Sequence, residues 1–547
     1  MKDNTGDNAM AGYTNNPGSV PWLKTMALTL ALTFMVGCAV GPNFVRPRPP
    51  EMADWSEKSE ALVRSENAEL ASWWKQFGDP VLDDLVGAAC RQNPSLHVAG
   101  LRILEARARL GIAVGNQYPQ LQQLNGQYAD YGLSENSPNT SASIDIAYAT
   151  VGLGFDAAWE LDFWGRFRRA VESGAWNLDA SIAGYDDLMV TLTAEVARVY
   201  VTLRTLESRL AIAQENVALQ ARSLQIARVL FEGGDVTELD VAQAGSLLAN
   251  TQSSIPRLQA QIRQAKNALA VLLGMLPGEV DHMLGGPGMI PAVPAAVAID
   301  VPAGMLRRRP DIRLAEAQMA SQCALIGVAQ ADLYPHFTLF GSIGLSASNA
   351  ALTAAGFPGG SSLGDIWNAD SMQHYGGIGF GWDIFNYGRI KNNVRVQDAR
   401  FQQLVENYKL TVLKAAQETE DALSGFLRSR EEVAFLQESE TAATRSVEIS
   451  MIQYREGLTD YQRVLDTQRS RAQAQDLLTS VRGTVMVNLV AVYKSLGGGW
   501  ESRAGRDFVP EDIRREMAER TDWGQLLEPR ESETQNGRQV NWRWPDW

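Results

Sequence analysis

The stretch VGLGFDAAWELDFWGR, residues 151–166, contains a change from one kind of structure to another. From Val151 to Asp162, apolar side chains alternate with glycine, alanine and acidic residues. This alternation with a period of two predicts a β-strand with one apolar face and one polar face that contacts water. The sequence therefore predicts that a strand ends shortly before Gly165.

A long helical pattern follows Gly165. Its apolar residues recur at alternating steps of four and three as far as Phe231, and Gln220 is the one interruption. This heptad seam predicts coiled-coil packing. A continuous helix from Gly165 to Gly234 would be about 100 Å long.

The same arrangement occurs twice in the chain. AAWELDFWGR (157–166) matches FGWDIFNYGR (380–389), and Phe231 with Gly234 matches Tyr454 with Gly457. Upstream, a proline, a glycine and a Tyr-Pro pair recur in the same order; they are Pro94, Gly111 and Tyr118, matched by Pro310, Gly327 and Tyr334. Three landmark sets in one order indicate an internal duplication.

Each copy is expected to contain a helix, two strands and two further helices. The first helix ends at Tyr-Pro, because proline disfavours helix in the residue before it. Gly377, Gly379 and Gly381 alternate with apolar residues and are expected in a strand, not in a phosphate-binding loop. Helices are expected to resume after Gly234 and Gly457, from residue 236 to about 273 and from 461 to about 496. The chain is thus expected to have four strands.

These patterns divide the chain into six segments. The expected boundaries are 1–37 for a signal peptide, 38–93 for a lipid-anchored N-terminal segment, 94–274 for the first repeat, 275–306 for a Pro/Gly-rich connector, 307–500 for the second repeat and 501–547 for a C-terminal tail. Within the tail, residues 535–547 are expected to be mobile.

The N-terminus has the features of a secretory signal. Lys24 precedes a short apolar run, residues 25–37, that ends in a small residue before Cys38. This Gly-Cys junction resembles a bacterial lipobox, in which the cysteine becomes the lipid-modified first residue; an ordinary signal with a chance cysteine is the alternative. Ala39 at the following position resembles the residue pattern of lipoproteins sorted to the outer membrane.

Composition excludes several functional classes. The net charge of -14 speaks against a nucleic-acid partner, which would require a basic patch. The four histidines lack metal-ligand spacing and no nucleophile motif occurs, so a hydrolase or metalloenzyme is disfavoured and no catalytic or metal-binding residue is predicted. Cys90 and Cys323 are expected to be small buried thiols; a disulfide between them is the alternative.

The predicted strands and helices together indicate a duct. Single-chain membrane barrels begin at eight strands and an open sheet edge is not tolerated in lipid, so several chains must each contribute four strands. No internal apolar run reaches the roughly 20 residues of a membrane-spanning helix. Helices of about 100 Å suit a tube that crosses a wide space.

Several motifs resemble the TolC-like outer-membrane factor family, and more closely its lipoprotein branch, the outer-membrane channels of multidrug efflux pumps. They are CAVGPNFVRP (38–47), WWKQFGDPVLDDLV (73–86), the two Tyr-Pro sites, the two Gly-Arg sites and LGGGW (496–500). The resemblance covers almost all of residues 38–500.

The resemblance implies an α+β membrane protein: an internally duplicated, long α-helical coiled-coil barrel with four β-strands per chain that form a 12-stranded trimeric β-barrel. It implies a homotrimer in the outer membrane of a Gram-negative bacterium, lipid-anchored and extending into the periplasm. Its partners would be a periplasmic adaptor and an inner-membrane transporter, which supplies the energy. No cofactor is implied other than the covalent lipid on Cys38.

The resemblance also implies roles for residues near the helix breaks. Gly234 and Gly457 match the hairpin turns at the periplasmic tip where adaptors dock. Asp466 matches a pore-constriction aspartate, and Asp240 and Tyr454 match partners in links that hold the tip shut. Arg463 departs from the family pattern. It lies three residues before Asp466 on one helix face and could pair with it, so that three copies would give an alternating charged ring at the pore gate.

Two other functions fit parts of the sequence. The same duct architecture serves type I protein secretion, and the sequence hardly separates that cargo from small toxic compounds. Heptads alone would also fit a non-conducting structural coiled-coil lipoprotein. The paired strands, which carry small residues on their polar face, favour a channel over that alternative.

Overall fold

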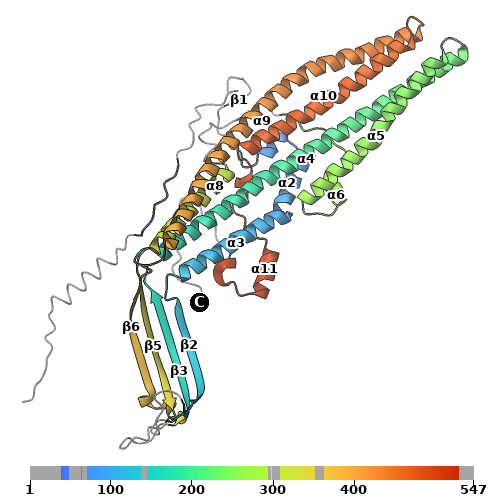
Figure 1. The fold of residues 1–547 in the computed structure, drawn as a ribbon. Coiled ribbons are helices and arrows are strands. Elements are labelled where there is room, and N and C mark those ends of the chain that lie inside the picture. The colour runs from blue at the N-terminus through green and yellow to red at the C-terminus, as the bar shows by residue number, and fades with distance from the viewer. Residues whose placement is uncertain are drawn as a thin grey trace, which may run out of the picture. The chain divides into compact units, whose positions relative to one another are not determined.

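The structure is a computed structural model that describes residues 39–47, 63–64, 70–136, 145–293, 297–298, 308–350 and 362–528 (Figure 1). Its contacts divide the chain into two compact units. The first comprises Met1–Pro42, Asn116–Ala170 and Ile326–Val394, and the second comprises Asn43–Gly115, Val171–Leu325 and Arg395–Trp547. Each sequence repeat contributes to both units, so a repeat is not a spatial domain.

The first unit contains a four-stranded antiparallel sheet with the order β2-β3-β5-β6. Its strands are β2 (Leu121–Gly132), β3 (Ala147–Glu160), β5 (His336–Ser348) and β6 (Met372–Gly381). Two short 3-10 helices, η2 (Leu363–Trp367) and η3 (Ala369–Ser371), precede β6. The prediction of two strands in each copy is confirmed.

The duplicated tryptophans make the same contact in both copies. The indole N–H of Trp159 donates to the carbonyl of Gln117 at 3.1 Å, and that of Trp382 donates to the carbonyl of Leu333 at 3.0 Å. Each acceptor directly precedes the Tyr-Pro of its copy. The Trp and Tyr-Pro landmarks thus tie the end of one strand to the start of the neighbouring one.

Residues 39–42 belong to the first unit and lie beside the end of β3. The amide of Val40 donates to the carbonyl of Trp164 at 2.9 Å, and the Arg169 guanidinium donates to the carbonyls of Val40 and Gly41 at 3.3 Å. A Cβ on Gly327 would lie 2.8 Å from the Val40 carbonyl oxygen, whereas one on the matching Gly111 would meet nothing within 4 Å. The lack of a side chain at Gly327, in the second copy, therefore allows residues 39–42 to pack close to its backbone.

Two long helical hairpins dominate the second unit. The first consists of α4 (Arg166–Gly233) and α5 (Glu238–Leu272), and the second of α9 (Arg389–Arg455) and α10 (Tyr461–Ser495) (Figure 1). The predicted seam of α4 is buried at Leu192, Val196, Val199, Leu203, Leu206, Leu224 and Ala227. Among the described helices, none has an apolar stretch long enough to cross a membrane.

Shorter helices pack around the hairpins in the second unit. They are α2 (Pro80–Gln92), α3 (Pro94–Gly115) and α8 (Pro310–Ala331), whose last turns belong to the first unit, together with the 3-10 helix η1 (Trp73–Phe77). Trp73 is fully buried and stacks on Tyr493 with ring centroids 5.1 Å apart. Within the described residues, no disulfide joins Cys90 to Cys323.

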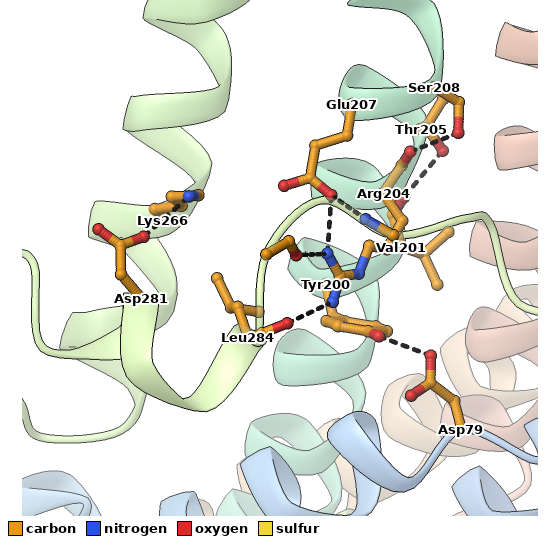
Figure 2. A network of polar contacts seen from close by, with 12 residues as sticks. Asp79, Tyr200, Val201, Arg204, Thr205, Glu207, Ser208, Lys266, Asp281 and Leu284 are labelled. Atoms are coloured by element: carbon orange, nitrogen blue, oxygen red, sulfur yellow. Dashed lines mark hydrogen bonds and ion pairs between the residues drawn. The ribbon is translucent and has the colours of Figure 1, made fainter. Parts of the chain in front are cut away.

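The connector between the repeats contains elements that the sequence pattern did not predict. A short helix, α6 (Val280–Leu284), begins it, and β4 (Val297–Ala298) pairs in parallel with β1 (Val63–Arg64). The buried guanidinium of Arg204 on α4 donates to the carbonyls of Leu284 and Gly286 at 3.1 and 2.8 Å (Figure 2). Glu207 forms an ion pair with Arg204 at 2.7 Å. The Tyr200 ring lies beneath the Arg204 guanidinium, and the Tyr200 hydroxyl donates to the Asp79 carboxylate at 2.5 Å.

Part of the predicted tail is folded. Residues 500–528, named the C-terminal strap here, contain η4 (Trp500–Arg503), α11 (Glu511–Arg520) and η5 (Gly524–Leu527). Val509 and Met517 of the strap pack on Leu104 of α3. Gly100 permits this approach, because a Cβ there would lie 2.1 Å from the Phe508 carbonyl oxygen. The segment 535–547, predicted to be mobile, lies outside the described residues.

Candidate gate at the hairpin ends

The two hairpin turns have the same backbone geometry. In the first, Gly234 has φ 85° and the amides of Gly234 and Asp235 donate to the carbonyls of Phe231 and Leu230. In the second, Gly457 has φ 71°, and the amides of residues 457 and 458 donate to the carbonyls of residues 454 and 453. This is the Schellman motif, which ends a helix on a left-handed residue. Both glycines lie at turns, where the resemblance places them.

An apolar cluster joins the two hairpins near these turns. Its buried members come from all four long helices: Leu224, Ala227, Ala244, Leu247, Tyr454, Tyr461, Val464 and Leu465. Tyr454 and Tyr461 meet edge to face with ring centroids 5.3 Å apart. The hairpin ends of one chain therefore cannot separate without exposing this cluster, named the tip cluster here.

Asp240 and Tyr454 lie near each other without a direct bond. The Asp240 carboxylate accepts the backbone N–H of Thr237 at 3.0 Å and so caps its own helix. The buried Tyr454 hydroxyl has no hydrogen-bond partner among the residues that the structure describes. Burial raises the pKa of Tyr454 to about 12, and the negative charge of Asp240 adds to the shift. Within one chain, the implied link between these residues is a charge proximity and not a hydrogen bond.

Asp466 and Arg463 are exposed on the first turns of α10, but they do not pair. The side-chain amide of Gln462 donates to the Asp466 carboxylate at 3.0 Å. Neither residue takes part in an ion pair within the described part of the chain. The predicted Arg463–Asp466 pair is not formed within this chain, where Gln462 bonds the Asp466 carboxylate from the i−4 position. Both charges therefore point away from the tip cluster into solvent.

Behind the tip cluster, a polar seam joins α4 and α10. The Gln468 amide donates to the Ser223 hydroxyl at 2.6 Å, and the Asn216 amide donates to Gln475 at 3.1 Å. Further along, Arg209 and Asp476 form a two-bond ion pair at 2.7 and 2.9 Å. The sequence pattern did not predict this seam. The one feature of the sequence that pointed to it was the interruption of the heptad pattern at Gln220.

Gln220 lies inside this seam and has no hydrogen-bond partner in the described part of the chain. It is 2% exposed, and neither its amide nitrogen nor its amide oxygen makes a hydrogen bond. A buried polar group without a partner costs about 1–3 kcal/mol. The contact between the two hairpins is therefore weaker here than an apolar heptad position would make it.

The other predicted site residue, Cys38, lies outside the described residues. The neighbouring Ala39 lies close to Gly165, since a Cβ on that glycine would be 2.7 Å from the Ala39 Cα. Gly165 follows β3 and has φ 79°, a conformation that favours glycine. The chain directly after Cys38 is thus fixed beside the end of the sheet.

A family model described as "Outer membrane efflux protein" matches residues 85–275 and 301–498, well over half of the chain. The chain belongs to the outer membrane efflux protein family. The C-terminal strap of this efflux protein lies beyond the matched residues.

Individual relatives agree with this assignment. The efflux protein is 32% identical over 485 residues to the pyoverdine export outer membrane protein OpmQ of Pseudomonas putida, covering 83% of this chain and 94% of that one. It is 28% identical to a probable outer membrane lipoprotein, SilC, of Salmonella typhimurium, covering 87% and 99%. The solved structure of the outer-membrane channel OprN is 32% identical with a TM-score of 0.77, covering 85% of this chain and all of that one.

The comparisons confirm the resemblance drawn from the sequence motifs. The efflux protein has the fold of outer-membrane channels, with long helices and a few antiparallel strands. The named relatives are an outer-membrane export protein and an outer-membrane channel, and the matching family model is that of outer-membrane efflux proteins.

Proposed function

We propose that this chain is the outer-membrane duct of a three-part efflux system and conducts small toxic compounds from an inner-membrane transporter and a periplasmic adaptor to the exterior. The observation that carries the proposal is the four-stranded sheet, which has one apolar and one polar face and two open edges. The transporter would supply the energy. The chain itself would use no cofactor, apart from a covalent lipid on Cys38.

Three copies would close the sheet into a barrel. β2 and β6 are the edge strands, and nearly all of their residues are exposed in the single chain. An open edge is not tolerated in lipid, and four strands are too few for a closed barrel. When β6 of each copy pairs with β2 of the next, a homotrimer forms a 12-stranded barrel with closed edges.

The helices also present surface for a neighbouring copy. Exposed apolar side chains recur along α9 and α10 at Leu410, Leu413, Phe435, Ile449, Ile452 and Leu477. Phe435 is 73% exposed, which is unusual for an aromatic ring on a soluble surface. Side-by-side packing of three copies would bury this surface and form a 12-helix tube that extends into the periplasm.

The hairpin ends would be the gate of the tube. Arg463 and Asp466 are exposed there, and three copies of each would place charges of both signs around the narrow end. Leu239 and Leu458, at the two turns, are 63% and 77% exposed and offer an apolar contact to the adaptor. The lipid on Cys38 would hold the base of the barrel at the inner leaflet of the outer membrane, since Ala39 lies beside the end of β3.

Native mass spectrometry of the purified full chain, followed by conductance measurements in planar bilayers, tests this function. The expected result is a trimer that forms discrete ion-conducting pores. Cys38→Ser should abolish labelling by radioactive palmitate while leaving the trimer intact. A monomer that forms no pores, even with the hairpin ends mutated, would overturn the proposal in favour of a structural lipoprotein.

A further inference from the structure

The strand register assigns every strand residue to one of two faces. Leu153 and Phe155 on β3 pair with Leu345 and Ile343 on β5, which places all four on the apolar face. The opposite face carries small and polar residues: Gln123, Asn125, Gln127, Thr150, Gly152, Gly154, Ser342, Gly344, Ser346, Gly377 and Gly379. In the proposed barrel the apolar face contacts lipid and the other face lines the water-filled lumen.

Aromatic rings lie on this otherwise polar lumen face. Phe340 on β5 pairs with Gly377 on β6, and a Cβ on Gly377 or Gly379 would lie 3.2 or 3.5 Å from the Phe340 ring. The ring therefore lies over these glycines instead of pointing away from the sheet. Tyr375, on the same face, has its ring centroid 6.4 Å from that of Phe340. Phe340 is 41% exposed and Tyr375 is 64% exposed. We name these two residues the aromatic strip.

The same face carries negative charge and no positive charge. None of the four strands contains lysine or arginine. Asp156 and Glu160 of β3 lie on the lumen face on either side of Ala158, the residue that pairs with Phe340. Diagonal neighbours in adjacent strands are about 7–8 Å apart. The aromatic strip is therefore flanked by two carboxylates.

The two carboxylates differ in their partners. Glu160 forms an ion pair with Arg166 at 3.3 Å, so its charge is partly neutralised. Asp156 accepts a hydrogen bond from the Asn125 amide at 2.5 Å and faces no basic side chain within the described sheet. Asp156 thus keeps a net negative charge beside Phe340.

We propose that the aromatic strip, together with Asp156, is a contact site for aromatic organic cations passing through the barrel. This inference rests on the proposed function, because it requires the polar face to line a lumen. The face of an aromatic ring attracts cations, and ring stacking adds to the attraction for an aromatic cargo. An aliphatic cation gains the charge and cation–π interactions but no ring stacking, and an anion is repelled by Asp156. A trimer would present three such sites.

The rings also fill the space above the glycines, and this packing alone would explain their presence. The test therefore needs a readout that packing does not change: the preference for an aromatic over an aliphatic cation of equal charge. Ethidium and tetrabutylammonium form such a pair, and naphthalenesulfonate serves as the aromatic anion. The variant is the double substitution Phe340→Ser with Tyr375→Ser. Gln373→Ser, on the same face of β6, is the matched control.

The full-length trimer in planar bilayers, with each probe added at the barrel side, gives the dissociation constant for current block. Wild type should bind ethidium at least about threefold more tightly than tetrabutylammonium, the size of one aromatic stacking contact. The double variant should lose this preference at unchanged potassium conductance, and Gln373→Ser should retain it. Asp156→Asn should weaken the block by both cations equally.

A double variant that keeps the wild-type preference would overturn the aromatic strip as a contact site. Equilibrium dialysis of ethidium against the detergent-solubilised protein repeats the comparison without requiring a conducting pore. Wild-type pores that conduct but bind ethidium no more tightly than tetrabutylammonium would contradict this inference without contradicting the proposed function. Absence of any current, with preferential binding retained in dialysis, would contradict the proposed function instead.

Discussion

Gln468 on α10 donates a buried hydrogen bond of 2.6 Å to the hydroxyl of Ser223 on α4, and this bond joins the two hairpins of one chain. It lies between the tip cluster and the Arg209–Asp476 ion pair. If the hairpin ends form the proposed gate, its opening within a chain would break these contacts, beginning at the tip. In the proposed duct, the strength of the seam between α4 and α10 would then set how readily the end of the tube opens.

Replacement of Gln220 by leucine should strengthen this seam. The substitution removes a buried amide that has no partner and restores the heptad pattern, so the free energy of unfolding should rise by about 1–2 kcal/mol. Chemical denaturation of the detergent-solubilised protein measures the change. Gln225→Leu, at an exposed position of the same helix, should change stability little. A loss of stability in Gln220→Leu would mean that the amide has a partner in the assembled protein.

The two turn glycines should be sensitive to substitution because of backbone conformation alone. A Cβ on Gly234 or Gly457 would meet nothing within 4 Å, but both residues have positive φ. Each Gly→Ala substitution should therefore cost about 1–2 kcal/mol, and Gly→Asn should cost less. Gly245→Ala, in the interior of α5 with equally open space, should instead stabilise the protein by about 0.5–1 kcal/mol. The midpoints of chemical denaturation measure these changes. If all three alanine variants changed stability in the same direction, this explanation would be refuted.

Acidification should strengthen the body of the second unit through Asp187. Burial, the nearby Asp311 and, to a smaller extent, Glu418 together raise the pKa of Asp187 to about 6, against the opposing effect of Arg309 and Lys494. A carboxyl whose pKa is higher in the folded than in the unfolded state destabilises the fold when ionised. This cost is present above pH 6 and is lost as the pH falls to about 4, the pKa of an unperturbed Asp.

The contribution should be isolated by Asp187→Asn. The difference in stability between variant and wild type should be about 1–3 kcal/mol in favour of the variant at pH 7.5 and should shrink towards pH 4.5. Denaturation curves at several pH values measure it. A difference that does not depend on pH would show that Asp187 titrates normally.

The C-terminal strap should contribute to stability through Arg503. Its guanidinium bonds the fully buried carboxylate of Asp186 at 2.5 Å, and Arg313 of α8 contacts the same carboxylate at 3.2 Å. Arg503→Ala leaves Arg313 as the one cation beside Asp186 and should lower the free energy of unfolding by about 2–4 kcal/mol. Arg515→Ala, which breaks only an exposed pair with Glu511 on the strap, should cost less than about 0.5 kcal/mol. Equal effects of the two variants would mean that the strap does not hold Asp186.

Much of the architecture could be predicted because the chain carries it twice. Trp159 and Trp382 mark equivalent strand ends, and each indole bonds the residue before Tyr-Pro, so the landmarks reflect one conserved contact within the chain. Gly234 and Gly457 could be placed at turns because few other residues accept positive φ.

The features that the sequence did not reveal depend on tertiary contacts. The strap helix Glu511–Arg520 is mostly charged and buries only Met517, so it lacks a strong apolar period. Arg463 and Asp466 have the spacing of an ion pair, but the same spacing rules allow Gln462 to reach Asp466, and local pattern cannot rank the two. The absence of a partner for Gln220 depends on which α10 side chains face it, and no pattern along α4 contains that information.

The most direct test of a gated outer-membrane duct is the single-channel conductance of the double variant Arg463→Ala with Asp466→Ala. Both side chains are exposed near the hairpin end, and their removal takes charge and bulk out of the narrow end of the tube. Arg445→Ala with Glu448→Ala, which removes one exposed ion pair from α9, is the matched control. We predict a conductance at least about twice that of wild type in the first variant and a wild-type value in the control. Equal conductance in all three proteins would contradict a gate at the hairpin ends.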